Sequence, residues 1–173
     1  MNAATEKMME VLRARDWSFD VDEDAEMVNT GCNGKNGQWR IRAGAINNCS
    51  VLILSRFPVD CPEPKRPACA EVLTRINFGL PVAGFEMDYK DGRIYCKTGI
   101  PFGKELPPTE LLDEALSFNL SVMDRYLPAI MQVIYSGTAP IKAVQDAEKP
   151  AKPKGKPDSD QPTLNAPPRF KLN

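Results

Sequence analysis

The sequence predicts an α+β fold: a two-layer sandwich in which helices cover one face of an antiparallel sheet. Three segments carry apolar residues at helical spacing, and between them lie segments with the alternation or the continuous apolar character of strands. Short connections between successive strands imply antiparallel pairing. The predicted order is helix, three strands, helix, two strands, helix, and all helices are expected on one side of the sheet.

The first predicted helix starts behind a Thr5 cap and ends near Arg15. Its apolar stripe consists of Met8, Val11 and Leu12. An extended segment follows, in which Trp17, Phe19 and Val21 alternate with polar residues. The segment therefore has the alternation of extended chain and lies ahead of the first predicted strand.

Three strands are predicted next, over residues 27–30, 39–45 and 49–57. In the second strand, Arg40 and Arg42 alternate with apolar residues, so one face of this strand is expected to contact water. The third strand contains a continuous apolar run over 51–54, which indicates a more central place in the sheet.

The second helix is predicted to begin at Pro67, which suits a first helical turn, and to end at Gly79. Its buried stripe consists of Cys69, Val72, Leu73 and Ile76. A hairpin follows around Asp91-Gly92, a preferred two-residue turn because both positions need positive φ.

The longest helix is predicted from Thr109 to about Ser136, with Gly137 as its stop. Its stripe consists of Leu112, Leu116, Leu120, Met123, Leu127, Ile130, Met131 and Ile134. Pro128 has no backbone N–H, so it is expected to remove one hydrogen bond and kink the helix near Asp124.

Composition changes beyond Gly137. Residues 138–173 contain seven of the 16 prolines and one aromatic residue, with seven basic and four acidic side chains. Such a stretch buries too little apolar surface to offset the entropy of ordering. The sequence therefore predicts one domain, residues 1–137, and a disordered Pro/Lys-rich tail, residues 138–173.

The absence of histidine excludes several kinds of chemistry. It removes the usual general base at neutral pH, every nucleophile activated by histidine, and the commonest metal ligand. The sequence therefore predicts no catalytic residue, no metal site and no cofactor. A net charge of −1 argues against generic binding to nucleic acid or acidic lipid, and no specific nucleic-acid partner is expected.

Location and redox state follow from two further patterns. No apolar run reaches the roughly 18 residues that cross a bilayer, and the first residues lack a signal-peptide pattern, so no membrane contact is expected. Five cysteines form no CxxC pair. This odd, irregular set predicts neither a disulfide framework nor a thiolate metal cage, and it favours the reducing cytoplasm.

Two weak motifs and two cysteines are candidate sites. The acidic segment 20–31 has Ala25 and Gly31 where a calcium loop needs glycine and glutamate, so a solvated turn is favoured. Residues 34–36 resemble the end of a phosphate loop, but a strand follows, which favours a hairpin loop. Cys32 and Cys61 lie in predicted loops and are the only candidates for a reactive thiol.

Two stretches resemble the YbjN-like family. In residues 77–95, Asn77 closes a helix, a strand ends in Asp88, and Asp91-Gly92 precedes a returning strand. In residues 124–130, a tyrosine and a proline lie within the last helix, as is frequent in that family. The resemblance covers about residues 5–137 and implies the fold of type III secretion chaperones. It also implies a non-enzymatic protein, since those chaperones are small acidic cytoplasmic homodimers that bind an extended partner segment, and YbjN-like proteins are described as sensory-transduction regulators.

The resulting hypothesis is a chaperone-like or regulatory adaptor that binds an unidentified protein or peptide and acts as a homodimer. The predicted partner-binding residues are Trp39 and Ile41 on the second strand and Val72 and Ile76 on the second helix. The alternative is a regulatory domain that binds a small ligand between the sheet and the long helix, near Trp17, Trp39 and Phe85.

Overall fold

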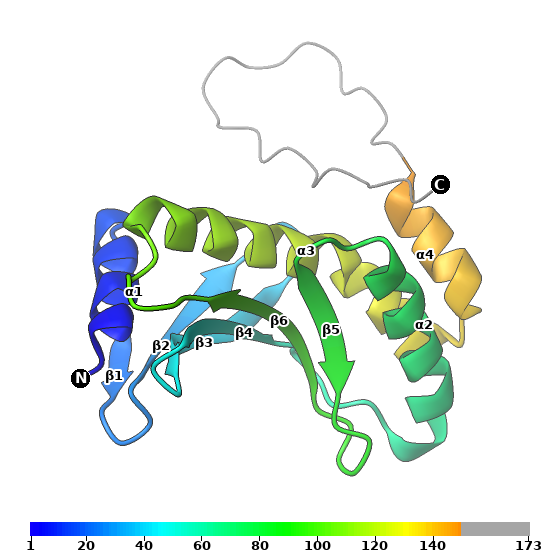
Figure 1. Cartoon of the computed structure of the whole chain (residues 1–173). Helices are drawn as coiled ribbons and strands as arrows, with labels where there is room; N and C mark the ends of the chain where they lie inside the picture. Colours follow the sequence, from blue (N-terminus) through cyan, green and yellow to red (C-terminus); the bar gives the residue numbers. More distant parts are fainter. Residues whose placement is uncertain (150–173) are drawn as a thin grey trace.

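The structure, a computed structural model, describes residues 1–149. These residues form one antiparallel sheet of six strands in the order β1-β2-β3-β4-β6-β5, with the α-helices on one side of it (Figure 1). The elements are α1 (Ala3–Ala14), β1 (Asp20–Asp22), β2 (Met27–Asn33), β3 (Gln38–Ile46), β4 (Ser50–Arg56), the 3₁₀ turn η1 (Glu63–Lys65), α2 (Arg66–Phe78), β5 (Ala83–Met87), β6 (Ile94–Pro101), α3 (Thr109–Ser136) and α4 (Pro140–Glu148). The predicted α+β class is confirmed.

The first helix is fastened to the sheet by Thr5. The side chain of Asn2 caps the helix by accepting a hydrogen bond from the N–H of Ala4 at 2.9 Å, so the predicted Thr5 cap is wrong. Thr5 lies fully buried inside the first turn. Its hydroxyl donates to the carbonyl of Glu26 at 2.8 Å and accepts from the N–H of Ala45 at 2.9 Å, which joins α1 to β2 and β3.

The three predicted strands correspond to β2, β3 and β4, with β2 continuing three residues further than expected. The extended segment before them ends in the short edge strand β1, which pairs with β2. The connection between β5 and β6 is longer than the predicted two-residue turn. It runs from Asp88 to Arg93, and of its two predicted positive-φ residues only Gly92 has one, at 81°. A Cβ on Gly92 would lie 2.1 Å from the carbonyl oxygen of Cys61, so close packing against that backbone fixes this loop.

Both edges of the sheet are closed to further strands. On β5, the side chain of Asn77 donates to the carbonyl of Phe85 at 2.8 Å and accepts from its N–H at 2.7 Å, and so occupies the outward backbone groups of that residue. On the opposite edge, β1 has only three residues, two of which are the acidic Asp20 and Asp22. Short, charged or covered edges disfavour pairing with another chain.

A buried polar cluster fixes α3 on the centre of the sheet. Asn119 lies fully buried in the apolar stripe of α3. Its Nδ2 donates to the carbonyl of Cys96 and to the hydroxyl of Thr98, each at 3.1 Å, and its Oδ1 accepts from the hydroxyl of Ser55 at 2.6 Å. Ser55 in turn accepts from Nε1 of Trp39 at 3.1 Å. One side chain therefore connects α3 to β3, β4 and β6.

Pro128 lies inside α3, as predicted, and its effect appears one turn earlier. Because proline has no N–H, the carbonyl of Asp124 lacks its usual helical donor. It accepts instead from Nδ2 of Asn36 at 2.9 Å, and the Asp124 carboxylate accepts from the N–H of Asn36 at 2.8 Å. The β2–β3 loop is thereby docked on α3, and Gly34 fits there because a Cβ would lie 2.4 Å from the Asp124 carboxylate.

The domain boundary predicted at Gly137 is too early. Gly137 does end α3 with a φ of 65°, but α4 follows at once and packs against α2 and α3. Ala143 and Val144 are buried there, and Arg125 donates to the carbonyl of Ala147 at 3.3 Å. Proline content concealed a helix that begins with Pro140, a position where proline is favourable. The rest of the predicted tail, from residue 150, lies outside the described residues.

The Asn119 cluster leads to a first prediction. Replacing Asn119 with alanine leaves the Ser55 and Thr98 hydroxyls and the Cys96 carbonyl buried with fewer partners. We expect a loss of about 3 kcal/mol in the free energy of unfolding, or about 10 °C in Tm, measured by calorimetry. The matched control, Asn33→Ala at the exposed end of β2, should change Tm by no more than about 2 °C. Equal effects of the two substitutions would contradict the role of the cluster.

A second prediction tests the docking of α4. Val144 is 8% exposed, whereas Ile141 on the same helix is 49% exposed. Val144→Asp places a carboxylate against α2 and α3, and we expect it to lower the Tm of the full chain by about 5 °C, because an unpaired buried charge is costly. Ile141→Asp, the control, should leave Tm nearly unchanged. If both variants melt like the parent, α4 does not contribute to the fold.

Candidate functional site

The face of the sheet opposite the helices is the candidate functional site. Within residues 1–149, no helix covers this face (Figure 1). We call it the open face. In β3 and β6 the buried residues alternate with exposed ones, so that Arg40, Arg42 and Lys97 point to the open face. Leu54 and Arg56 of β4 lie half-buried on the same face. The wet face predicted for the second strand is thereby confirmed.

Strand register brings basic side chains from different strands together. Arg40 lies directly opposite Gly31 of β2 on one side and opposite Arg56 of β4 on the other. The same row continues with Tyr95 of β6 and Glu86 of β5. In the neighbouring row, Arg42 is followed by Leu54 and Lys97. Opposed residues of antiparallel strands have Cβ atoms about 5 Å apart, so Arg40 and Arg56 are direct neighbours.

Most basic side chains on the open face are paired, with one exception. Arg42 pairs with Asp22 at 3.0 Å, Lys97 with Glu86, and Arg56 with Asp60. Arg56 also donates to the carbonyl of Phe57 at 3.2 Å, and its guanidinium lies 5.3 Å from the ring centre of Tyr95. Arg40 has no ion pair or hydrogen bond to any side chain among residues 1–149. The open face thus carries, at one end of its middle strands, a guanidinium whose donors are unsatisfied by this part of the chain.

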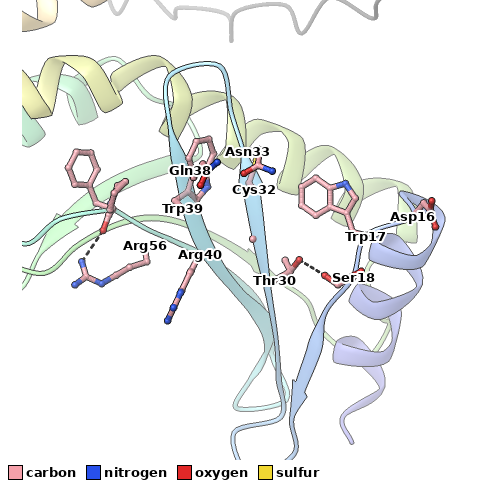
Figure 2. A pocket seen from close by; sticks show the side chains of 13 residues that line it. Asp16, Trp17, Ser18, Thr30, Cys32, Asn33, Gln38, Trp39, Arg40 and Arg56 are labelled. Carbon is pink, nitrogen blue, oxygen red and sulfur yellow. Dashed lines mark hydrogen bonds between the residues drawn. The ribbon is translucent and has the colours of Figure 1, made fainter.

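Two open hollows meet at this pair of arginines. The larger, about 1010 Å³, lies at the end of the sheet beside Trp17, Cys32 and Trp39 (Figure 2). The smaller, about 680 Å³, lies over β2–β4 and is lined by Phe19, Leu54 and Tyr95, among others. Both are also lined by Ser18, Thr30, Gly31, Arg40 and Arg56. In Figure 2 the Arg40 side chain projects from its strand away from α3.

The partner-binding residues predicted from the sequence are all buried. Trp39 and Ile41 belong to the core, although Trp39 also lines the larger hollow and Ile41 the smaller one, and Val72 and Ile76 are buried on α2. A binding role of these four residues stays a prediction. The proposed ligand region near Trp17, Trp39 and Phe85 is divided: the two tryptophans line the larger hollow, whereas Phe85 is in the core.

The candidate thiols are in environments that disfavour thiolate. Burial, reinforced by the Asp124 carboxylate, raises the pKa of Cys32 to about 11. Burial also raises the pKa of Cys61, in spite of Arg66 and Lys65 nearby. Cys61 lies in a loop, as predicted, but is buried, whereas Cys32 lies in β2 and the loop predicted for it is wrong. At neutral pH neither residue has the lowered pKa that characterises a catalytic cysteine.

The two weak motifs have structural roles. Residues 34–36 form the loop between β2 and β3 that docks on Asp124, as the hairpin interpretation predicted. In the acidic segment, Asp22 accepts from the N–H of Ala25 at 3.0 Å and pairs with Arg42, which is typical of a turn. Within residues 1–149, no group of three or more cysteine and acidic side chains is placed to hold a metal ion. No helix in this part of the chain is long and apolar enough to cross a membrane.

Sequence reasoning missed the pairing of Arg40 with Arg56. The alternation in the second strand placed Arg40 on the wet face, but Arg56 lies at the end of a strand that reads as apolar and central. Only the β3–β4 register makes them neighbours. The sequence did hold a partial signal. In each strand the arginine lies an even number of residues from other residues of the open face, which places both arginines on that face.

Two comparisons with known proteins give matches. A family model described as "YbjN: Putative bacterial sensory transduction regulator" matches residues 5–132. A crystal structure of YbjN, a putative transcription regulator from E. coli, is similar over 66% of this chain and 87% of that one, with 14% identity and a TM-score of 0.45. Curated proteins give no match. Because the family model spans well over half of the sequence, the chain belongs to the YbjN family of regulators.

Proposed function

We propose that this chain is a non-enzymatic regulatory module that binds a protein partner on the open face of its sheet and acts as a homodimer in the cytoplasm. The observation that carries the proposal is the open face itself. In residues 1–149 it is left uncovered by the helices, it is hollowed, and it carries an unpaired guanidinium beside apolar side chains.

The composition of the open face suits protein recognition. Leu54 and Tyr95 are half-buried and lie between charged residues of the neighbouring strands. Arginine and tyrosine are enriched where proteins bind one another, because each combines a large contact area with hydrogen-bonding groups. The closed edges of the sheet direct a partner to this face and away from strand addition.

Two observations support a mode of action without catalysis, in a reducing compartment. The chain has no histidine, and the thiols of Cys32 and Cys61 have raised pKa values. All five cysteines are free. A chain that keeps five unpaired thiols fits the cytoplasm, where such thiols stay reduced.

A dimer is supported by an apolar segment at the end of α2. Phe78 is 83% exposed and Val82 is 60% exposed, and half-buried Leu80 lies between them. Large apolar side chains this exposed at adjacent positions mark an interaction surface more often than isolated ones do. The Asn77 contact to Phe85 excludes continuous strand pairing at this edge, so we propose side-chain packing between the two copies.

The second candidate function is binding of a small ligand in the larger hollow. Trp17 and Trp39 both line it, as the sequence-based alternative expected for the tryptophans. The hollow is open and bordered by Asp16, Arg40 and Arg56, so a ligand there would be polar. A screen of metabolites by thermal shift distinguishes this candidate, since only a ligand that binds the folded chain raises Tm.

The dimer leads to a third prediction. Light scattering on the full chain at tens of micromolar should give twice the chain mass, and Phe78→Asp should convert it to monomer, because a carboxylate at the contact is costly to desolvate. The matched control is Tyr135→Asp, on an aromatic residue that is also largely exposed but lies at the end of α3. A parent chain that is strictly monomeric at this concentration would overturn the dimer.

A fourth prediction tests the binding face. A photo-crosslinking residue at Leu54, on the open face, should capture a discrete protein when the chain is expressed in its native cells. The same residue at Glu71, on exposed α2, is the control. Capture at Leu54 that is absent at Glu71 is expected. Equal capture at both positions, or none at either, would contradict binding on the open face.

A further inference from the structure

The open face holds two like charges in direct opposition at one end of its middle strands. Arg40 and Arg56 are cross-strand partners in β3 and β4. Opposed like charges destabilise an antiparallel pair. Arg56 is partly neutralised by Asp60, but no carboxylate of residues 1–149 pairs with Arg40. This arrangement is unfavourable for the free chain and becomes favourable when an anionic group lies between the two guanidiniums.

The two arginines differ in how firmly they are held. Arg56 donates to the carbonyls of Phe57 and Ile94, at 3.2 and 3.5 Å, and stacks on Tyr95, so its guanidinium has a fixed direction. Arg40 has no such contact and can adjust its side chain. Arg56 is thus held in place before a ligand binds, whereas Arg40 can move to meet it. This combination suits an anionic side chain on a flexible segment.

The space around the pair is suited to an extended ligand. Gly31, the neighbour of Arg40 on β2, has no side chain, and a Cβ there would approach only the carbonyl oxygen of Trp39, at 3.7 Å. The two hollows share Gly31, Arg40 and Arg56 among their lining residues, so they are neighbours, and we call them together the groove. Two neighbouring open hollows fit a stretch of chain better than a compact molecule.

The charges at the border of the groove limit what can bind. Asp20 and Asp22 lie on β1, and Glu86 lies on β5, so positive charge is confined to the middle of the sheet. A nucleic acid brings a negative charge at every nucleotide and would meet these carboxylates. Leu54, Tyr95 and Phe19 beside the arginines favour apolar neighbours for the anionic group. These features select a peptide with an isolated acidic side chain between apolar ones.

We propose that the groove binds an extended segment of a partner protein, with an acidic side chain held between Arg40 and Arg56 and the adjacent apolar side chains packed on Leu54 and Tyr95. This inference rests on the proposed function and names the chemistry of the partner. Two guanidiniums around one carboxylate provide charge-assisted hydrogen bonds, which depend on both geometry and charge.

The test uses fluorescence anisotropy with the full chain. The probe is a short labelled peptide with a single aspartate between leucines, and the control peptide has asparagine in place of that aspartate. We expect the acidic peptide to bind, the control to bind at least tenfold more weakly, and the affinity to fall as salt is raised.

Four variants place the binding on this groove. Arg40→Gln should weaken the acidic peptide about tenfold, because it removes one charged donor. Gly31→Glu should weaken binding by about the same factor, because the introduced carboxylate pairs with Arg40 in place of the peptide. Gly31→Gln, which has the same shape without the charge, should bind the acidic peptide more tightly than Gly31→Glu does, and Arg75→Gln, on exposed α2, should bind like the parent. Because Arg40 is exposed and opposes a like charge, Arg40→Gln should not lower Tm, so lost binding is distinct from lost folding.

The outcomes are separable. If both peptides bind equally and Arg40→Gln has no effect, the acidic preference is wrong, while capture at Leu54 still tests the proposed function independently. If neither peptide binds, or if an oligonucleotide displaces the acidic peptide, this inference is overturned. A failure of both the peptide assay and the Leu54 crosslink would remove the proposed function as well.

Discussion

The architecture depends on the buried hydrogen bonds of Asn119. An amide placed in an apolar helix stripe is costly to bury unless its donors and acceptor are satisfied. Here Ser55, Thr98 and the Cys96 carbonyl satisfy them, from the neighbouring strands β4 and β6. The helix α3 therefore has one favourable position on the sheet, since sliding or rotating it would break several buried bonds at once. With α3 fixed, α1, α2 and α4 pack around it on the same side.

A consequence of this packing is that the two faces of the sheet have different roles. The helix side uses its apolar residues for the core, from Trp39 in β3 to Cys96 in β6. Strand edges are also occupied, by Asn77 at β5 and by the acidic β1. Of the described sheet, the open face is then the surface that is left for contact with a partner. Its side chains lie on strands whose other side chains are packed in the core, so the groove has a rigid backbone beneath it.

Much of this fold could be predicted from periodicity, because β3 and α3 have unambiguous patterns. Prediction failed where tertiary contacts override local signals. Proline-rich composition concealed α4, whose small apolar face gains stability only against α2 and α3. Threonine is a residue type that often caps helices, but the Thr5 hydroxyl instead joins α1 to β2 and β3. The site was harder still, since the neighbours of Arg40 are set by register, and register across β3–β4 follows from the chain fold as a whole.

The open face also shows where stability gives way to recognition. A threonine or valine at position 40 would suit an antiparallel strand better than an arginine facing Arg56. The sheet nevertheless tolerates this pair, because the Asn119 cluster and the core supply its stability from the other face. A locally unfavourable pair on a well-supported surface is typical of residues selected for what they bind. Under the proposal above, the two arginines serve recognition, whereas the tryptophan and isoleucine beside Arg40 lie in the core.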